Sequence, residues 1–202
     1  RMWAGGRLSW SSPNPLRVGD AVQRTSTIAS VNHKSGRTGD LLFVGVQHQI
    51  SNPQGVGLTE EHDIVYRAAA QAGDPNPPPI AAETGAAWQR EIRPDDVLLF
   101  RYSALTFNGH RIHYDRRYVT EVEGYPGLIV HGPLIATLLM DLLRRHASDA
   151  QVSRFEFKAV RPTFDLHPFR LNGQPSADGK TVRLWAQDHE GWLTMQASAT
   201  LS

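Results

Sequence analysis

The sequence contains no cysteine among its 202 residues. Disulfides, thiolate metal sites and thiol nucleophiles are therefore excluded. The chain also lacks a surplus of either charge, because 21 basic residues face 20 acidic ones. That balance argues against a nucleic-acid or anionic membrane surface as the main function. No apolar run approaches the roughly 18–20 residues that a membrane span needs. We therefore expect no nucleic-acid or membrane partner, and a cytoplasmic location.

What the chain does contain is enough apolar residues for a folded core, at 40% of its composition. Its first residues, Arg1 to Gly6, offer neither an initiator methionine nor a signal-peptide pattern. We therefore expect that further residues precede Arg1 in the natural chain.

Alternating and β-branched residues predict four strands in the first third of the chain, because such residues suit a pleated, half-buried surface. The strands are expected at Arg7–Trp10, Ala21–Asn32, Leu41–Ile50 and Glu60–Arg67, with turns at Lys34–Gly39 and Asn52–Gly55. Successive strands joined by short turns predict an antiparallel meander.

A proline-rich stretch follows these strands. Four of the 13 prolines lie between Asp74 and Pro79, within the alanine-rich range Ala68–Ala87. That composition is typical of an extended linker. We therefore predict an N-terminal half over residues 1–67, a linker over 68–90 and a C-terminal half over 91–202.

One strong helix pattern organises the predicted C-terminal half. Leucines recur at helical spacing over Leu134–Leu143, and basic residues follow at positions 144–146. Basic side chains there favour the negative end of the helix dipole. We expect Gly132 at the N-cap and Pro133 at the first helical position, where the missing N–H of proline costs nothing.

The rest of this half is predicted as strand, apart from a short helix over Arg116–Glu121 that Asp115 can cap. Strands are expected at Val97–Thr106, Phe155–Val160, Leu166–Asn172, Lys180–Asp188 and Gly191–Leu201, with turns at Asn172–Gly173 and Asp188–Gly191. Their order echoes that of the first half and predicts an internal repeat. Because the first copy lacks a helix, we expect that helix upstream of Arg1.

Strands arranged around one long helix predict a hot-dog fold, an α+β architecture in which an antiparallel sheet wraps a central helix. Residues Phe107–Asp115 (FNGHRIHYD) and Leu128–Leu134 (LIVHGPL) resemble the MaoC-like hydratase/dehydratase family. The likeness is strongest to its branch of type 2 hydroxyacyl-thioester dehydratases and mesaconyl-CoA hydratases, and extends more weakly to Met2–Gly6 and Leu16–Asp20. The resemblance implies a double hot-dog whose N-terminal half lacks its helix in this chain.

The resemblance assigns the family's catalytic histidine to His113 and the acid that follows it to Asp115. The family's catalytic Asp falls at Asn108, five residues before His113. An imidazole titrates near neutral pH and can act as acid or base. An amide can orient a water molecule but cannot take its proton. Either His113 therefore moves both protons of the reaction, or His110 or an unplaced carboxylate assists.

The start of the long helix would supply the rest of the site. His131-Gly132 matches the family's His-Gly pair, and a free amide at a helix N-terminus can hold the thioester oxygen as its negative charge grows. Catalytic roles are thus expected for His113, Asn108 and Gly132, and substrate binding for His110, Arg111, His131 and Arg161. The phosphates of coenzyme A could meet Arg101, Arg111, Lys158 or Arg161.

Plainer interpretations of these residues stay open. His113 and His110 could be structural, Asn108 could bond to its own loop, and Gly132 could be a helix cap alone. His110, His113 and Asp115 could also be metal ligands. The implied fold has no dedicated metal loop, so we expect neither a metal nor another cofactor.

The expected activity is that of a hydro-lyase acting on the α,β double bond of an acyl-CoA thioester, as a mesaconyl-CoA hydratase or a 3-hydroxyacyl-thioester dehydratase. The resemblance also implies a homodimer. Two alternatives stay open, an acyl-CoA thioesterase and a non-catalytic acyl-thioester binding protein. The amide at Asn108 counts against the thioesterase, which needs a carboxylate, and favours the binding protein.

Overall fold

The computed structural model describes residues 2–36, 39–67 and 78–202. The chain divides into two compact units. The first comprises Arg1–Pro78, Ala150–Lys158 and Ser198–Ser202, and the second comprises Pro79–Asp149 and Ala159–Ala197. Residues 68–77 of the predicted linker and residues 37–38 of the predicted turn lie outside the described residues. The division into halves at 1–67, 68–90 and 91–202 stays a prediction.

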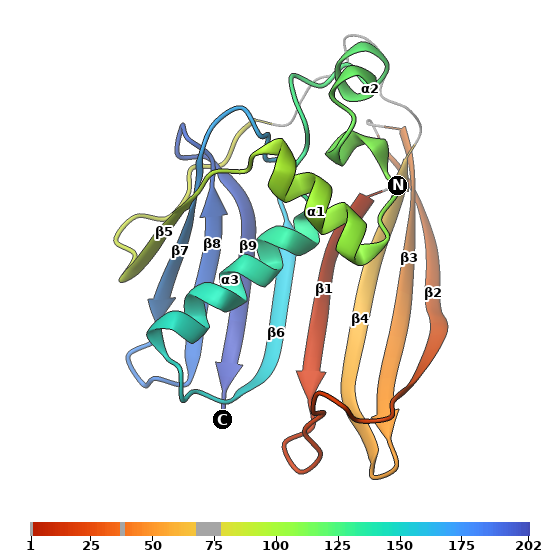
Figure 1. The fold of residues 1–202 in the computed structure, drawn as a ribbon, viewed down its shortest axis with the longest axis vertical. Helices are drawn as coiled ribbons and strands as arrows, with labels where there is room; N and C mark the ends of the chain where they lie inside the picture. The colour runs from red at the N-terminus through yellow and green to blue at the C-terminus, as the bar shows by residue number, and fades with distance from the viewer. Residues whose placement is uncertain (1, 37–38, 68–77) are drawn as a thin grey trace. The chain divides into compact units, whose positions relative to one another are not determined.

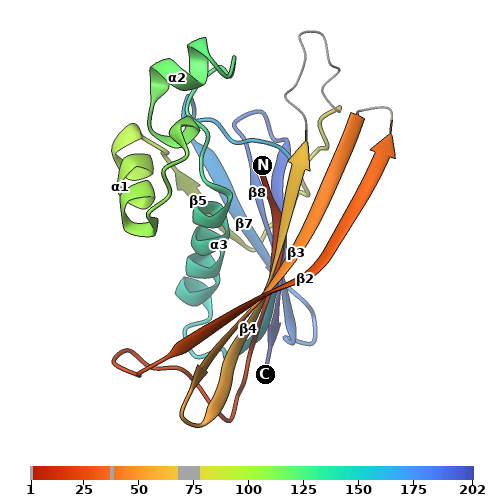
Figure 2. The ribbon, with the colours of Figure 1, turned by 90° about the vertical axis from the view of Figure 1, so that its right-hand side faces the viewer.

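The first unit is built on long antiparallel strands (Figures 1 and 2). They are β1 (Met2–Trp10), β2 (Gln23–Gly36), β3 (Gly39–Asn52), β4 (Gly55–Arg67) and β6 (Val152–Ala159), in the order β2-β3-β4-β1-β6. The predicted meander is correct for β2, β3 and β4 but wrong for β1, which pairs with β4 from Met2↔Val65 to Trp10↔Leu58. The connection from β1 to β2 contains Pro13 and Pro15 and is too long for a tight hairpin, so β1 can reach the far side of the meander.

The second unit packs one long helix on an antiparallel sheet. Its strands are β5 (Trp88–Ile92), β7 (Phe169–Pro175), β8 (Thr181–Gln187) and most of β9 (Leu193–Leu201), in the order β9-β8-β7-β5. Helix α3 (Gly132–His146) lies against β5, β7 and β8 (Figures 1 and 2). Its buried residues are Leu134, Ile135, Ala136, Leu139, Leu142 and Leu143. Each buried leucine contributes roughly 1.5–3 kcal/mol relative to an exposed one, so this face positions the helix firmly.

Helix α1 (Asp96–Thr106) occupies the segment that the sequence predicted as a strand. The prediction was wrong because apolar residues lie on all sides of this helix, which hides the helical period. Its buried residues, Leu99 and Ser103, are four apart and face inward together. The start signal was present in the sequence, since the Asp95 carboxylate accepts a hydrogen bond from Leu98 N at 2.7 Å.

The remaining helix boundaries follow their capping residues. As predicted, Asp115 caps α2 (Arg116–Glu121), accepting a hydrogen bond from Tyr118 N at 3.0 Å. The start of α3 differs by one residue, because His131 is the N-cap and Gly132 already has helical geometry. Pro133 then takes the second helical position, where its missing N–H is again harmless.

The turn between β7 and β8 also lies later than predicted. Asn172 and Gly173 are inside β7, paired with Trp185 and Leu184 of β8. Glycine is needed at 173 for close packing, since a Cβ there would lie 2.8 Å from the Trp88 ring. The chain reverses instead near Gly179, whose positive φ of 69° suits a tight turn. The predicted turn after Asp188 is confirmed by its carboxylate, which accepts a hydrogen bond from Trp192 N.

The order of connections repeats along the chain, as the sequence predicted. In each copy the last three strands follow one another, and the first strand lies beside the last: β1 beside β4, and β6 beside β9. These features together confirm the predicted hot-dog fold. Among the described residues, no helix is both long and apolar enough to cross a membrane.

Candidate active site

His113 ends a short 3₁₀ turn (Arg111–His113) and is buried, with 8% of its surface exposed. Its Nδ1 lies 2.7 Å from the backbone oxygen of Ile129. A carbonyl oxygen can only accept, so Nδ1 carries the proton and Nε2 keeps a lone pair. The pKa of His113 is lowered to about 4, chiefly by burial, and the nearby His110 acts in the same direction. The imidazole is therefore neutral at neutral pH and its Nε2 can take a proton.

His131 lies directly against this ring. The two imidazoles stack with centroids 3.8 Å apart and planes 18° from parallel. His131 is fully buried, and Ser103 Oγ of α1 lies 2.8 Å from its Nε2. Burial lowers the pKa of His131 to about 3, and the neighbouring His113 acts in the same direction. The structure thus brings two neutral histidines together at the start of α3.

Hydrogen bonds on both sides of the 128–130 segment hold the chain where the two rings can stack. Ile129 N donates to Ile112 O at 3.0 Å, and Val130 N donates to Thr163 O at 2.8 Å. The buried Asp165 carboxylate accepts from Leu128 N at 2.9 Å and pairs with Arg116. Because these contacts hold the chain just before His131, they set the position of its ring against His113.

Gly132 follows His131 as the first helical residue of α3. The first amides of a helix have no acceptor within it, so the Gly132 N–H is available to an incoming oxygen. A Cβ at this position would meet only Met195 Cε, at 3.8 Å. The glycine is therefore not required by packing against the protein itself.

Asn108 is held by its own loop. Its Oδ1 accepts a hydrogen bond from His110 N at 3.1 Å, and its backbone N–H donates to Ser103 O at 2.9 Å. The side-chain amide nitrogen is left to contact a water or a substrate. His110 is exposed, and its ring meets that of His113 edge-on with centroids 5.6 Å apart.

The two predicted substrate-binding arginines lie in different surroundings. Arg111 is paired with Asp115 at 2.7 Å and covers the Tyr118 ring at 4.1 Å, so its charge is already partnered. Arg161 lies 3.7 Å from Asp188, and its buried Nη1 makes no hydrogen bond with the described residues. Among the described residues, no hydrogen bond or ion pair joins Arg161 to His113 or His131.

Sequence reasoning missed two residues that contact His131. Ser103 holds its Nε2, and the Tyr102 ring meets its face edge-on at 4.8 Å. Both lie on α1, which was predicted as a strand, so nothing indicated that they point toward the histidines. The capping signal at Asp95 would have revealed the helix.

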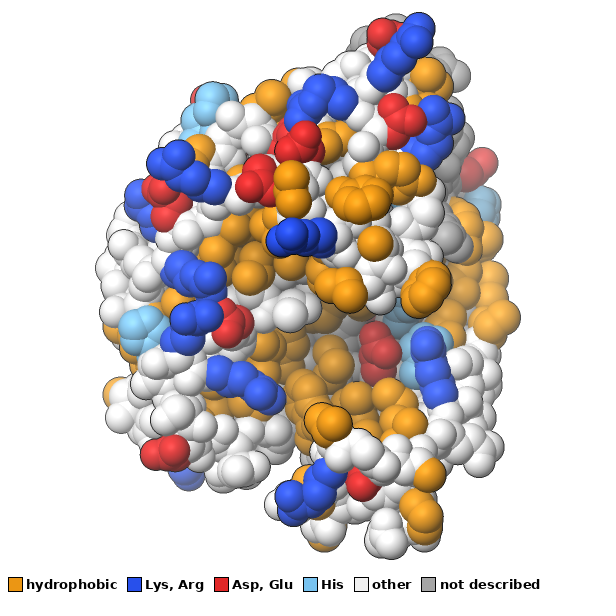
Figure 3. All heavy atoms as spheres, in the orientation of Figure 1, with side chains coloured by type: hydrophobic (Ala, Val, Ile, Leu, Met, Phe, Trp, Pro, Cys, Tyr) orange, Lys and Arg blue, Asp and Glu red, His pale blue; other side chains and the backbone are white. Residues whose placement is uncertain are grey.

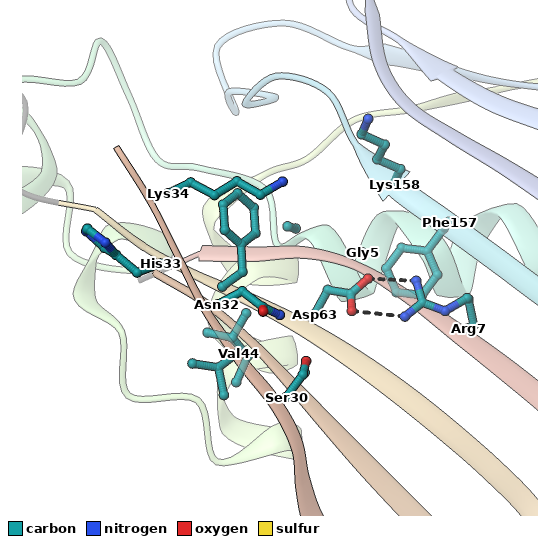
Figure 4. Close-up of a pocket in the computed structure, with 14 residues that line it drawn as sticks. Gly5, Arg7, Ser30, Asn32, His33, Lys34, Val44, Asp63, Phe157 and Lys158 are labelled. Carbon is teal, nitrogen blue, oxygen red and sulfur yellow. Dashed lines mark hydrogen bonds and ion pairs between the residues drawn. The ribbon is translucent and has the colours of Figure 1, made fainter. Parts of the chain in front are cut away.

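The first unit contains a separate cavity of about 660 Å³ (Figure 4). Its lining includes Phe43, Lys34, Lys158 and the ion pair of Arg7 with Asp63. None of the predicted catalytic residues lines it. Within the described ranges, no group of three or more His, Asp or Glu side chains is placed to hold a metal ion.

A long helix on an antiparallel sheet, with a histidine loop against the helix start, defines a hot-dog enzyme of the MaoC-like hydratase/dehydratase class. The family model for hydroxyacyl-thioester dehydratase type 2 matches residues 1–165, and the chain belongs to that family. The resemblance predicted from the two motifs is thereby confirmed.

Individual relatives agree with this assignment. Over 204 residues the chain is 46% identical to the mesaconyl-C(4)-CoA hydratase of Chloroflexus aurantiacus, covering 100% of this chain and 70% of that protein. The structure of HtdX from Mycobacterium tuberculosis superposes with a TM-score of 0.72 at 19% identity, covering 98% of this chain and 76% of that one. Full-length peroxisomal multifunctional enzyme type 2 from Drosophila melanogaster gives a TM-score of 0.78 at 13% identity, covering 100% of this chain but 37% of that longer one. The family and the hydratase relative confirm the expected class of enzyme, an acyl-CoA hydratase/dehydratase.

Proposed function

We propose that this protein adds water to, or removes it from, the α,β double bond of mesaconyl-CoA or a 3-hydroxyacyl thioester, with His113 moving the proton. One observation carries the proposal. A neutral imidazole with its lone pair on Nε2 is held at the start of α3, where the Gly132 amide has no partner within the helix. Base and oxyanion donor are the two groups that this reaction needs.

In the hydration direction, His113 Nε2 takes a proton from a water molecule as the water oxygen bonds to Cβ of the enoyl thioester. The electron pair of the double bond moves toward Cα and the thioester oxygen, which accepts a hydrogen bond from the Gly132 amide. The imidazolium then returns its proton to Cα, and the enzyme is neutral again. The lowered pKa of about 4 makes that imidazolium a better proton donor in the return step and the neutral ring a weaker base in the first step. Asn108 would orient the water through its amide nitrogen.

Binding roles follow from burial. His131 is fully buried, so we propose that it acts on the substrate through His113. His110 and Arg111, exposed on the same loop, would contact the substrate at the mouth of the site, and Arg161 would contact a phosphate of coenzyme A.

Dimer formation is supported by apolar side chains gathered over α1 (Figure 3), where Phe100 is 60% and Leu105 80% exposed. The cytoplasmic location stays a prediction.

Turnover of mesaconyl-C4-CoA and crotonyl-CoA, followed by loss of the conjugated absorbance, tests the proposal. We expect His113→Ala to lower kcat/KM by at least about 10²-fold, since it removes the acid–base group. His189→Gln, at an exposed histidine of the same unit, is the matched control and should retain activity.

Other outcomes would identify the alternatives. Release of free thiol with the double bond intact would indicate a thioesterase. Calorimetric binding of acyl-CoA without turnover would indicate a non-catalytic protein, and a gain of activity in Asn108→Asp would then show that the missing acid is the cause. Full activity of His113→Ala would also overturn the mechanism.

A further inference from the structure

The hydroxyl of Ser103 faces the stacked histidines from the inner side of α1. Ser103 is 5% exposed, and its Oγ lies 2.8 Å from His131 Nε2. Serine inside a helix often bonds back to the carbonyl one turn earlier. Here the bond to His131 is the one that this hydroxyl makes within the described ranges, so the side chain is aimed at the histidine.

Counting donors and acceptors fixes the proton positions of the pair. His131 Nδ1 is buried and makes no hydrogen bond with the described residues. If Nε2–H donated to Ser103, both the serine hydrogen and the Nδ1 lone pair would lack partners. If Ser103 donates to Nε2, only the Nδ1–H of His131 lacks a partner. The second arrangement leaves fewer buried polar groups unpaired and is therefore favoured.

The orientation of His131 then determines that of His113. The His131 ring lies within 18° of parallel to the His113 ring, with the centroids 3.8 Å apart, and covers one of its faces. On the edge, His113 Nδ1 is tied to Ile129 O at 2.7 Å. One face of the His113 ring is covered and its Nδ1 is hydrogen-bonded. Its Nε2 is therefore the atom that can react. Rotation of the His131 ring would release the face contact.

We propose that Ser103 is a positioning residue for the hydration site: its hydroxyl sets the tautomer and orientation of His131, whose stacked ring keeps His113 Nε2 ready for proton transfer. This role rests on the hydro-lyase function proposed above. Ser103 itself contacts neither water nor substrate. Its effect reaches the reaction through the two imidazoles.

Kinetics give the first test. We expect Ser103→Ala to lower kcat by about 10–100-fold while KM changes little, because misaligned reacting groups slow the chemical step. Ser103→Thr keeps the hydroxyl and should recover most of the loss. Thr106→Ala is the control, since it removes a hydroxyl of the same helix that bonds back to Tyr102 O at 2.7 Å. Equal kcat values for Ser103→Ala and Thr106→Ala would overturn the proposal.

A second test is independent of turnover. In ¹⁵N-histidine-labelled protein, the ring resonances of His113 and His131 should each show a protonated Nδ1 and an unprotonated Nε2. In Ser103→Ala the His131 pattern should change or broaden, and in Thr106→Ala it should not. A wild-type His131 protonated at Nε2 would sink the assignment of Ser103 as donor. If the wild type lacks hydratase activity but shows the expected resonances, the proposed function fails while the Ser103–His131 geometry stands.

Discussion

Two neutral imidazoles stacked in a buried site place opposite demands on the protein. Burial suits the neutral ring, but the proton taken by His113 creates a charge beside His131, 3.8 Å away. The depressed pKa values of about 4 and about 3 reflect that cost. A buried imidazolium is unfavourable, so it readily gives up its proton. The pair therefore favours a proton held briefly between water and Cα rather than a stable imidazolium.

The Gly132 amide can be tested by adding one methyl group. Gly132→Ala should fold as the wild type does, because the new Cβ would meet only Met195 Cε at 3.8 Å and alanine favours helix by up to about 1 kcal/mol over glycine. If the thioester oxygen docks on this amide, the methyl narrows its approach, and kcat/KM should fall by roughly 10²-fold. Thermal unfolding and enoyl-CoA turnover measure the two effects. Unchanged turnover would exclude the amide as the oxyanion donor.

At the scale of elements, the two motifs predicted a loop and a helix start correctly, whereas the periodicities missed helix α1. The spacing within Phe107–Asp115 put His113 on a loop, and the His-Gly pair put the helix start within one residue of the observed N-cap, His131. The contact of the two rings could not be predicted, since it depends on hydrogen bonds between the 128–130 segment and residues far along the chain. Ser103 was missed for a related reason, because α1 is apolar on several sides and its period is obscured.

Asp165 fixes the 128–130 segment that precedes His131, and removing its carboxylate should destabilise the fold around the site. Its carboxylate is 4% exposed, accepts from Leu128 N at 2.9 Å and pairs with Arg116. Asp165→Ala leaves a buried N–H unpaired, so we expect a loss of roughly 2–3 kcal/mol in the free energy of unfolding. Urea titration would measure it. Glu121→Ala removes a carboxylate from an exposed pair with Arg117 and should change stability little. Equal losses in both variants would contradict this role.

At the scale of the whole molecule, the chemistry lies within one of the two compact units. All residues of the proposed site belong to the second unit, with α1, α2 and α3. The first unit repeats the strand order, and its own described residues form no helix. In this unit His48 is buried and His62 is partly buried, and burial lowers the pKa values of both. Both units therefore keep histidines neutral at the expense of stability in acid.

Keeping these histidines neutral predicts how the free energy of unfolding changes with pH. Between pH 6.5 and about 4 the unfolded chain binds protons on histidines that the folded protein keeps neutral. Stability should be level above pH 6.5 and fall as the pH drops toward 4. His113 alone accounts for roughly 3 kcal/mol of this loss, since each unit of pKa shift corresponds to about 1.4 kcal/mol. Aspartates with lowered pKa, such as Asp115, add to the loss mainly at the acid end of this window, below about pH 5.

Urea unfolding at several pH values between 7 and 4 checks the prediction. His113→Gln removes one of the titrating groups and should flatten the dependence in this window, even if the variant is less stable at pH 7. Asn32→Gln, at an exposed position of β2, leaves every titrating group in place and should keep the slope. The two slopes are informative together. If His113→Gln keeps the full slope, His113 takes up its proton near its ordinary pKa in the folded protein, and burial does not hold this imidazole neutral down to about pH 4.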